Sequence, residues 1–438
     1  MPTPESEQEA SQGATGGSSG SDDRQTSSWR IVRVSAAGMS ELAKQAGQLV
    51  GKAVDLFARA DSLRFTPEHP CRLAIVAEHP DDLAAKLTLA SQSIDTPKAA
   101  MLPRKDTFVG SPTQPPGKVA FLFSGQGSQY PGMLRPLLDE YPPAADTLRQ
   151  IDETLCRLDM PSFAEFAGPE SQVLGKDVWL TQLSLLCADT IVYRSLTAHG
   201  IRPDYLAGHS YGEFPALLAA GAWDLENAIL GTRARCRAVE ACRDITGRMI
   251  SIAASGEVIE QACHELGGQL HLANYNSPRQ TVVGGDEPSI ARLEEYLIAQ
   301  KIACKVISVP RPFHTPMMEP VREPLAEGLR PIVFRAPSVP IFSSVTNRFE
   351  TEPEQIRANL VAQITSPVRY VELINHLVEA GTRAIVEVGP RQVLCGLHNK
   401  ILAGRDVAVI GCDNKTQPGF SRLLAVEAYL DAYGLREG

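Results

Sequence analysis

Residues 207–217, AGHSYGEFPAL, place a serine between two glycines, after an apolar approach and before a stretch of helical character. They fit the pattern G-x-S-x-G, in which a tight turn from strand to helix leaves no room for side chains beside the serine. The N-terminus of the helix would offer free backbone N–H groups, which stabilise an oxyanion as its charge develops. The pattern indicates a nucleophile at Ser210, with a buried turn and a capping serine as the alternative.

A second glycine-rich turn follows an apolar strand at residues 123–129, FSGQGSQ. Its glycines would let a backbone N–H, that of Gln126, approach another group closely. Donors from two different loops can form an oxyanion hole. The alternative is an ordinary turn between strand and helix. Phosphate binding is disfavoured, because neither G-x-G-x-x-G nor the lysine of a P-loop is present.

A serine hydroxyl is a poor nucleophile until a neighbouring base takes its proton. Most of the nine histidines lie in helical or linker contexts. His314 differs, because it follows an apolar strand within VPRPFHTPMM, residues 309–318, between prolines that would fix the loop. We expect His314 to reach the serine turn and act as the base.

Composition excludes several classes of function. Of the 438 residues, 43% are hydrophobic and 21% charged, and the formal net charge is -9, which argues against a nucleic-acid partner. No apolar run approaches the roughly 18 residues of a membrane span. Nine cysteines without ligand spacing predict reduced thiols, a cytoplasmic location and no bound metal or cofactor.

The order of apolar and polar stretches predicts an α/β fold in several parts. Residues 1–28 are rich in Gly, Ser and acids and predict a disordered tail, natural or added. Residues 29–117 predict a small α/β linker domain of strand, helix (39–60), strand and helix, ending in a proline-rich connector at 111–118.

The remainder of the chain predicts a large domain with an insert. Alternating strands and helices predict a parallel sheet covered by helices, a hydrolase-like large subdomain formed by residues 118–248 and 310–438. Residues 249–309 between them follow the order strand, helix, strand, strand, helix, strand. That order predicts an inserted ferredoxin-like small subdomain.

The motifs, taken together, resemble the malonyl-CoA:acyl carrier protein acyltransferases, including the acyltransferase domains of fatty acid and polyketide synthases. GQGSQ, GHSYGE, an arginine in TRARCR, FHTPMM, QITSPVRY and VEVGP occur in this order over residues 119 to about 415. The resemblance implies that Ser210 carries the acyl group and that His314 is the base. It also implies that the N–H groups of Gln126 and Tyr211 bind the oxyanion and that the main-chain carbonyl of Gln363 orients the histidine.

The resemblance further implies that Arg235, 25 positions after the serine, binds the carboxylate of the extender unit. A planar guanidinium grips a carboxylate through two parallel hydrogen bonds, whereas lysine offers a point charge. Arg233 and Arg237 are neighbouring competitors for this role. Gln182 and Asn276 match pocket positions, with core polar roles as the alternative.

Acyl selectivity is inferred from the same resemblance. Phe313, before the histidine, is similar to malonyl-using domains, because its ring would crowd the space that an α-methyl group needs. Tyr211 stands where leucine, valine, isoleucine or glutamine is more usual. GHSYGE therefore resembles the acyltransferase domains of iterative synthases that make enediyne or polyunsaturated chains.

The implied substrate is malonyl-CoA, and the implied acceptor is the phosphopantetheine thiol of an acyl carrier protein. Residues 29–117 resemble the linker between ketosynthase and acyltransferase in multidomain synthases. The resemblance thus implies a neighbouring ketosynthase and a chain excised from a larger polypeptide.

Two other functions stay open at this stage. An α/β-hydrolase esterase or thioesterase uses the same serine turn and needs an acid between the serine and the histidine, where acids do occur. A docking module without turnover would need a basic patch for an acidic carrier protein. The candidates for that patch are Arg233, Arg237, Arg243 and Arg248.

Overall fold

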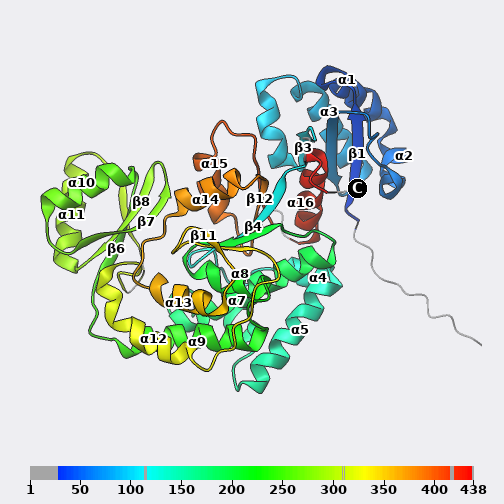
Figure 1. Cartoon of the computed structure of the whole chain (residues 1–438). Helices are drawn as coiled ribbons and strands as arrows, with labels where there is room; N and C mark the ends of the chain where they lie inside the picture. The colour runs from blue at the N-terminus through cyan, green and yellow to red at the C-terminus, as the bar shows by residue number, and fades with distance from the viewer. Residues whose placement is uncertain (1–27, 113–115, 308, 310, 415–418, 437–438) are drawn as a thin grey trace, which may run out of the picture.

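The structure is a computed structural model and describes residues 28–112, 116–307, 309, 311–414 and 419–436. The predicted tail therefore lies outside the described residues except for residue 28, and part of the predicted connector also lies outside them. The chain forms three sheets, of three, six and four strands, with helices packed on their faces (Figure 1).

The six-stranded sheet lies at the centre of the molecule and has the order β11-β10-β5-β4-β12-β13. Its strands β10, β5, β4, β12 and β13 run parallel, as the alternation of elements predicts. β11 pairs antiparallel with β10 at one edge, which the sequence analysis did not anticipate. The strands are β4 (Lys118–Phe123), β5 (Tyr205–Gly208), β10 (Ile341–Ser343), β11 (Arg348–Glu350), β12 (Thr382–Val388) and β13 (Ala408–Gly411).

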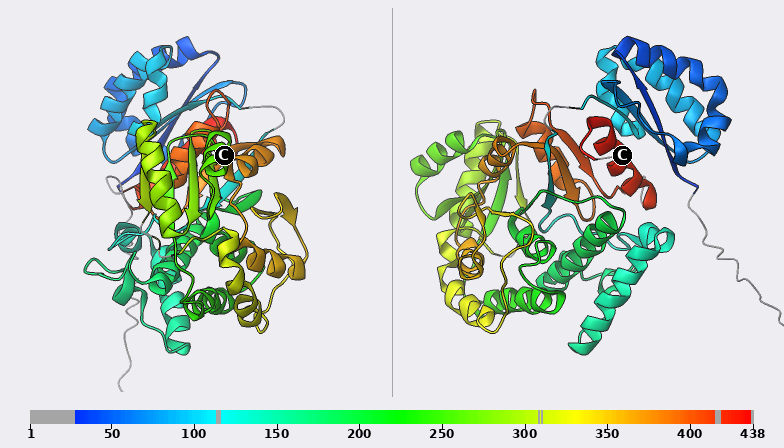
Figure 2. Two further views of the ribbon diagram at one scale, coloured as in Figure 1. Left: turned by 90° about the vertical axis from the view of Figure 1, so that its left-hand side faces the viewer. Right: turned by 45° about the vertical axis from the view of Figure 1, so that its right-hand side comes forward.

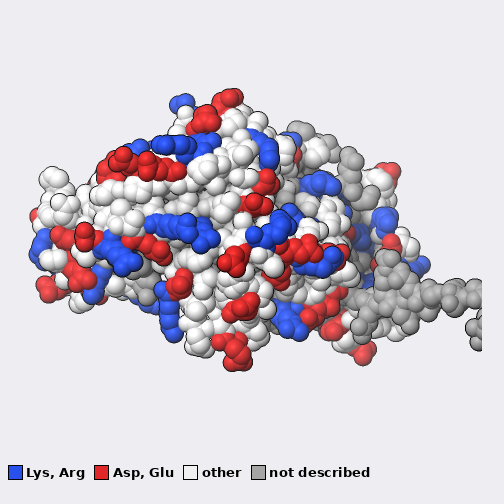
Figure 3. Space-filling model, turned by 90° about the horizontal axis from the view of Figure 1, so that it is seen from below, with Lys and Arg blue, Asp and Glu red and all other residues white. Residues whose placement is uncertain are grey.

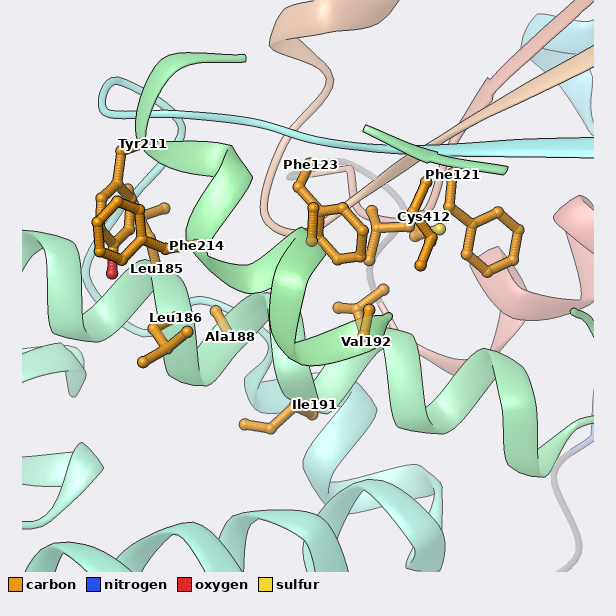
Figure 4. Packing of buried hydrophobic residues seen from close by; sticks show 14 of the residues in the cluster. Phe121, Phe123, Leu185, Leu186, Ala188, Ile191, Val192, Tyr211, Phe214 and Cys412 are labelled. Carbon is orange, nitrogen blue, oxygen red and sulfur yellow. The ribbon is translucent and has the colours of Figure 1, made fainter. Parts of the chain in front are cut away.

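Helices cover both faces of this sheet, because alternate residues of its strands are apolar on both sides. Phe121 and Phe123 of β4 point to the face packed by the long helix α7 (Val178–Ala198), where Figure 4 shows them beside Val192. Ala120 and Leu122 point to the other face, against α14 (Tyr370–Glu379) and α15 (Val393–Ile401).

Further helices pack around α7 and complete the large core on the face of Phe121 and Phe123. They are α4 (Arg135–Glu140), α5 (Pro142–Arg157), α6 (Phe163–Ala167), α8 (Glu213–Ala219), α9 (Leu225–Ala241), α12 (Arg322–Leu329) and α13 (Pro353–Gln363). Among the described residues, no helix combines the length and the apolar character that crossing a membrane requires.

The four-stranded sheet is antiparallel and has the order β7-β8-β6-β9. Its elements follow the chain order that the sequence analysis predicts for residues 249–309. They are β6 (Arg248–Ile252), α10 (Gly256–Leu266), β7 (Leu270–Ser277), β8 (Gln280–Gly285), α11 (Glu287–Ala299) and β9 (Cys304–Ile307). Ile250 and Ile252 of β6 pack with Ile259 of α10 and Leu293 of α11 in a separate small core.

The N-terminal sheet is antiparallel, β1 (Arg30–Ala36), β2 (Cys71–Ala77) and β3 (Thr107–Gly110), and β3 was not predicted. The predicted helix 39–60 is instead two helices, α1 (Met39–Leu49) and α2 (Ala53–Ala58), separated by a tight turn at Gly51. Glycine disfavours a helix interior, because ordering its flexible backbone costs more entropy.

The C-terminal helix α16 (Phe420–Tyr433) packs on β2 and β3, whereas α3 (Pro80–Ser93) packs with α1 on the opposite face. Phe108 of β3 stacks on Tyr429 with ring centres 4.9 Å apart. Figures 1 and 2 show the C-terminal helix, in red, beside the N-terminal sheet, in blue. The N-terminal sheet and the C-terminal helix therefore fold together.

Candidate active site

The serine turn lies where β5 ends and α8 begins. Ser210 has a positive φ of 55°, a left-handed backbone conformation that residues other than glycine rarely adopt. The turn packs directly on the loop that follows β4, since a Cβ atom at Gly212 would lie 2.1 Å from the carbonyl oxygen of Phe123. One at Gly125 would lie 2.7 Å from the carbonyl oxygen of His209. Both glycines are therefore required by close approach of the backbones.

His314 reaches the serine from a loop after β9. Its Nε2 lies 2.7 Å from Oγ of Ser210, and its Nδ1 lies 2.9 Å from the carbonyl oxygen of Gln363. Gln363 ends α13, where helical carbonyls lack partners within the helix. Because Nδ1–H donates to this carbonyl, the neutral ring has its lone pair at Nε2, facing the serine hydroxyl.

The surroundings keep His314 neutral. Burial, and next to it the positive charge of Arg235, lower the pKa of His314 from 6.5 to about 3. A neutral imidazole is the form that accepts a proton. His314 is therefore ready to act as a base at neutral pH.

The turns that carry Gln126 and Tyr211 pack against each other, since a Cβ atom at Gly125 would lie 3.5 Å from the main-chain nitrogen of Tyr211. The N–H of Gly212 donates the first hydrogen bond of the helical turn, to the carbonyl of His209. The N–H of Tyr211 comes one residue earlier and therefore lies outside the hydrogen bonds of the helix. Gln126 lies on the loop after β4 and, like Ser210, lines an open cleft. Its side-chain oxygen accepts a hydrogen bond of 3.2 Å from Nε2 of Gln182 on α7.

Arg235 lies on α9 and is only 2% exposed. Its guanidinium lies over three aromatic rings, 5.2 Å from the ring centre of Phe313 and 5.9 Å from those of Tyr211 and Phe214. Its Nη1 has no hydrogen-bond partner among the described residues. Burying an unpaired charge is costly, so this arrangement fits an arginine that binds an anion from outside the chain.

The competing arginines face elsewhere. Arg233 and Arg237 line a groove between α9 and α12, apart from the serine. Arg248 is exposed and forms an ion pair of 3.2 Å with Glu287. Arg243 is exposed as well. Of the three arginines in TRARCR, only Arg235 lines the cleft of Ser210.

Ser210, His314 and Arg235 line one open cleft between the six-stranded and four-stranded sheets. Asn276, at the end of β7, lines it too and accepts a hydrogen bond of 2.8 Å from Nε2 of His209. The sequence analysis missed that α15 forms another wall, through Leu397 and other residues. Its pattern is that of an ordinary amphipathic helix, which carries no local signal for a binding wall.

Glu213 is a further residue that the sequence analysis did not single out. It is buried and bonded to the side chain of Gln363. In the sequence it is an ordinary acid in the first turn of a helix, a position that the helix dipole favours. Its one local signal is that it directly follows the G-x-S-x-G pattern.

Among the described residues, no group of three or more His, Cys, Asp or Glu side chains could hold a metal ion. The site consists of a serine in a left-handed turn, a neutral histidine bonded to it, two glycine-rich turns packed against each other, and a buried arginine whose Nη1 has no hydrogen-bond partner among the described residues. An α/β fold with this site defines the class of enzymes that transfer acyl groups through a serine nucleophile.

Comparison with known proteins identifies the family. Residues 120–435 match the family model described as acyl transferase domain, so the chain belongs to this family of acyltransferases. The malonyl CoA-acyl carrier protein transacylase of Haemophilus influenzae is 34% identical over 294 residues, which are 65% of this chain and 92% of that protein.

Solved structures of acyltransferases are similar to this chain along most of its length. The acyltransferase domain from module 8 of the salinomycin polyketide synthase has a TM-score of 0.79 and 26% identity, covering 93% of this chain and 97% of that one. A malonyl-transacylase in complex with its type II polyketide synthase acyl-carrier protein gives a TM-score of 0.65 and 30% identity, covering 71% of this chain and 99% of that one.

Proposed function

We propose that this acyltransferase loads a malonyl unit from malonyl-CoA onto Ser210 and passes it to the phosphopantetheine thiol of an acyl carrier protein in polyketide or fatty acid biosynthesis. The observation that carries the proposal is the buried, unpaired guanidinium of Arg235 in the cleft of Ser210 and His314. A malonyl thioester offers the carboxylate that this arginine lacks. The transacylase relatives support the same substrate and acceptor.

The first half-reaction forms an ester. Oγ of Ser210 attacks the thioester carbonyl carbon as its proton passes to Nε2 of His314, 2.7 Å away. The oxyanion accepts hydrogen bonds from the N–H groups of Tyr211 and Gln126. When the carbonyl reforms, the C–S bond breaks and the sulfur of coenzyme A takes the proton from the imidazolium.

The second half-reaction reverses these steps with a different thiol. The phosphopantetheine thiol gives its proton to Nε2 of His314 and attacks the Ser210 ester, and Oγ leaves with that proton. Arg235 holds the malonyl carboxylate in both half-reactions and so selects acyl groups that carry one. Phe313, whose ring lies 5.2 Å from the guanidinium and lines the cleft, limits the space beside the α-carbon.

We further propose the domain division set out from the sequence: a hydrolase-like large subdomain of 118–248 and 310–438, a ferredoxin-like small subdomain of 249–309, and a linker domain of 29–117 beside a ketosynthase. The βαββαβ order and antiparallel pairing of the four-stranded sheet support the small subdomain. The nine free thiols support a cytoplasmic location.

Observations on the described residues disfavour the alternatives. An α/β-hydrolase would present a carboxylate to Nδ1 of the histidine, but here Nδ1 faces the main-chain carbonyl of Gln363. A pure docking module would need a basic patch. On the face that Figure 3 shows, lysines and arginines are instead interspersed with acids.

The proposal is tested by intact-protein mass spectrometry after brief incubation with malonyl-, methylmalonyl- or acetyl-CoA. We expect a malonyl adduct on the native chain and none on Ser210→Ala, because removing a nucleophile costs on the order of a millionfold in rate. An adduct that persists in Ser210→Ala would contradict the assignment of the nucleophile. Free coenzyme A released without an adduct or carrier loading would indicate a hydrolase.

A further inference from the structure

The side chain of Gln363, and not only its carbonyl, contacts the reacting pair. Its Nε2 donates one hydrogen bond of 3.0 Å to the main-chain oxygen of Ser210 and another of 2.6 Å to Oε2 of Glu213. Its main-chain oxygen accepts from Nδ1 of His314, and the N–H of His314 donates to the carbonyl of Ile364, the next residue. One residue thus joins the backbone of the nucleophile to the ring of the base.

Glu213 anchors this residue. The carboxylate is 4% exposed, and its second oxygen, Oε1, accepts a hydrogen bond of 2.7 Å from the N–H of Ser344, just after β10. Both oxygens therefore accept from nitrogen donors. A glutamine at this position could not do the same, because its amide has one acceptor oxygen and would turn its NH₂ group toward a second donor.

Ser210 and His314 need such support. Both have a positive φ, 55° and 64°, and such conformations persist only where the surrounding structure imposes them. The bond from Gln363 to the carbonyl of Ser210 opposes relaxation of the turn. The two bonds from His314 to Gln363 and Ile364 do the same for the base.

The surroundings of Glu213 oppose its charge, and its hydrogen bonds compensate for this. A small cavity with room for about one water molecule lies beside it, lined also by Glu350 and Asn359. Burial, and with it the negative charge of Glu350, raises the pKa of Glu213 and so opposes its charged form. The hydrogen bonds from Ser344 and Gln363 lower that pKa and keep the carboxylate oriented toward the site.

We propose that Glu213 is a positioning residue of the acyl transfer: it fixes the amide of Gln363, which in turn fixes the backbone of Ser210 beside His314. The inference rests on the proposed function only for the identity of the acyl group. The geometry between Ser210 and His314 governs attack on any electrophile.

The test uses the full chain and two reagents. One is malonyl-CoA, and the other is a fluorophosphonate probe, which reports attack by Ser210 without involving a carboxylate. The variants are Glu213→Gln, Gln363→Met, which keeps the main-chain carbonyl, and the double variant. The matched control is Glu350→Gln, an acid beside the same cavity that does not bond Gln363.

We expect Glu213→Gln and Gln363→Met each to slow labelling of Ser210 by about tenfold to 100-fold, since small misplacements of reacting groups have effects of this size. The KM for malonyl-CoA should change little, because Arg235 is untouched. The double variant should be no slower than the slower single variant, because both changes break the same link. Glu350→Gln should stay within about twofold of the native rate.

Native labelling rates in Glu213→Gln, multiplied losses in the double variant, or an equal loss in Glu350→Gln would overturn the inference. If Glu213→Gln does not fold, as thermal unfolding would reveal, a native labelling rate in Gln363→Met overturns it alone. A native chain that reacts with the probe but not with malonyl-CoA would contradict the proposed function instead, and the probe rates would still decide the role of Glu213.

Discussion

Arg422 and Arg235 are both almost completely buried, at 6% and 2% exposure, but the regions around them satisfy the guanidinium differently. Arg422 lies where α16 meets the N-terminal sheet. It forms an ion pair of 2.8 Å with Asp106 and donates at 3.0 Å to the carbonyl of Gly411. Arg235 contacts aromatic rings and has no carboxylate against it among the described residues.

The difference separates a structural charge from a binding charge. Where a buried cation has its anion inside the chain, removing it damages the fold, because the anion is left uncompensated. Where the chain supplies no anion, the fold tolerates an apolar replacement and the ligand provides the missing partner. Four predictions test this difference between the two arginines.

The largest effect is expected at Arg422. Arg422→Met should lower the free energy of unfolding by about 3–5 kcal/mol, because Asp106 stays buried and loses its ion pair with the guanidinium. Denaturant unfolding measures this loss, and adding Asp106→Asn should recover part of it. Malonyl loading at a temperature where the variant is folded should stay native. A loss of stability below about 1 kcal/mol would contradict this prediction, because the ion pair of Arg422 would then contribute no more than an ordinary surface ion pair.

Arg235→Met should show the opposite behaviour. Its free energy of unfolding should be unchanged or higher, because an unpaired buried charge is removed. Malonyl transfer should fall about 100-fold, the size of a lost charge-assisted bidentate contact, and acetyl transfer far less. Initial rates with both thioesters measure this difference. Arg237→Met, an exposed change on the same helix, is the control. Equal losses for both thioesters would make Arg235 structural.

The charge of Arg235 should also be visible in the pH dependence of serine reactivity. The pKa of His314 lies at about 3, so the base stays deprotonated as the pH falls through 6.5, and labelling by the fluorophosphonate should show no step there. Removing the positive charge in Arg235→Met raises the pKa of His314. The loss of labelling should therefore occur at a higher pH in that variant. A native step near 6.5 would contradict this view of the site.

The smallest effect is expected at Tyr211. Its hydroxyl lies 3.0 Å from Oγ1 of Thr232, away from the guanidinium that its ring supports. Tyr211→Phe should cost about 1 kcal/mol of stability, the value of one hydrogen bond, and leave the preference for malonyl over acetyl intact. Denaturant unfolding and competition between the two thioesters measure these quantities. A changed preference would show that the hydroxyl, rather than the ring, acts on the acyl group.

Local signals in the sequence pointed to the residues that the fold brings together in the cleft. The glycines around Ser210 and in the loop of Gln126 are needed because backbones touch there, and such steric needs appear directly as residue types. The alternation of strands and helices likewise predicted the parallel strands and the strand order of residues 249–309 along the chain. The family motifs pointed to Arg235, Gln363 and Asn276.

Tertiary packing decided the rest. The sequence alone shows that a serine, a histidine and an arginine with the right chemistry are present, because these side-chain types are read directly from it. Which arginine of Arg233, Arg235 and Arg237 faces the serine depends on how α9 packs. The side-chain role of Gln363, its link to Glu213, and the seat of α16 on the N-terminal sheet join segments far apart in the chain. Such contacts leave no local pattern, since only the folded arrangement brings their partners together.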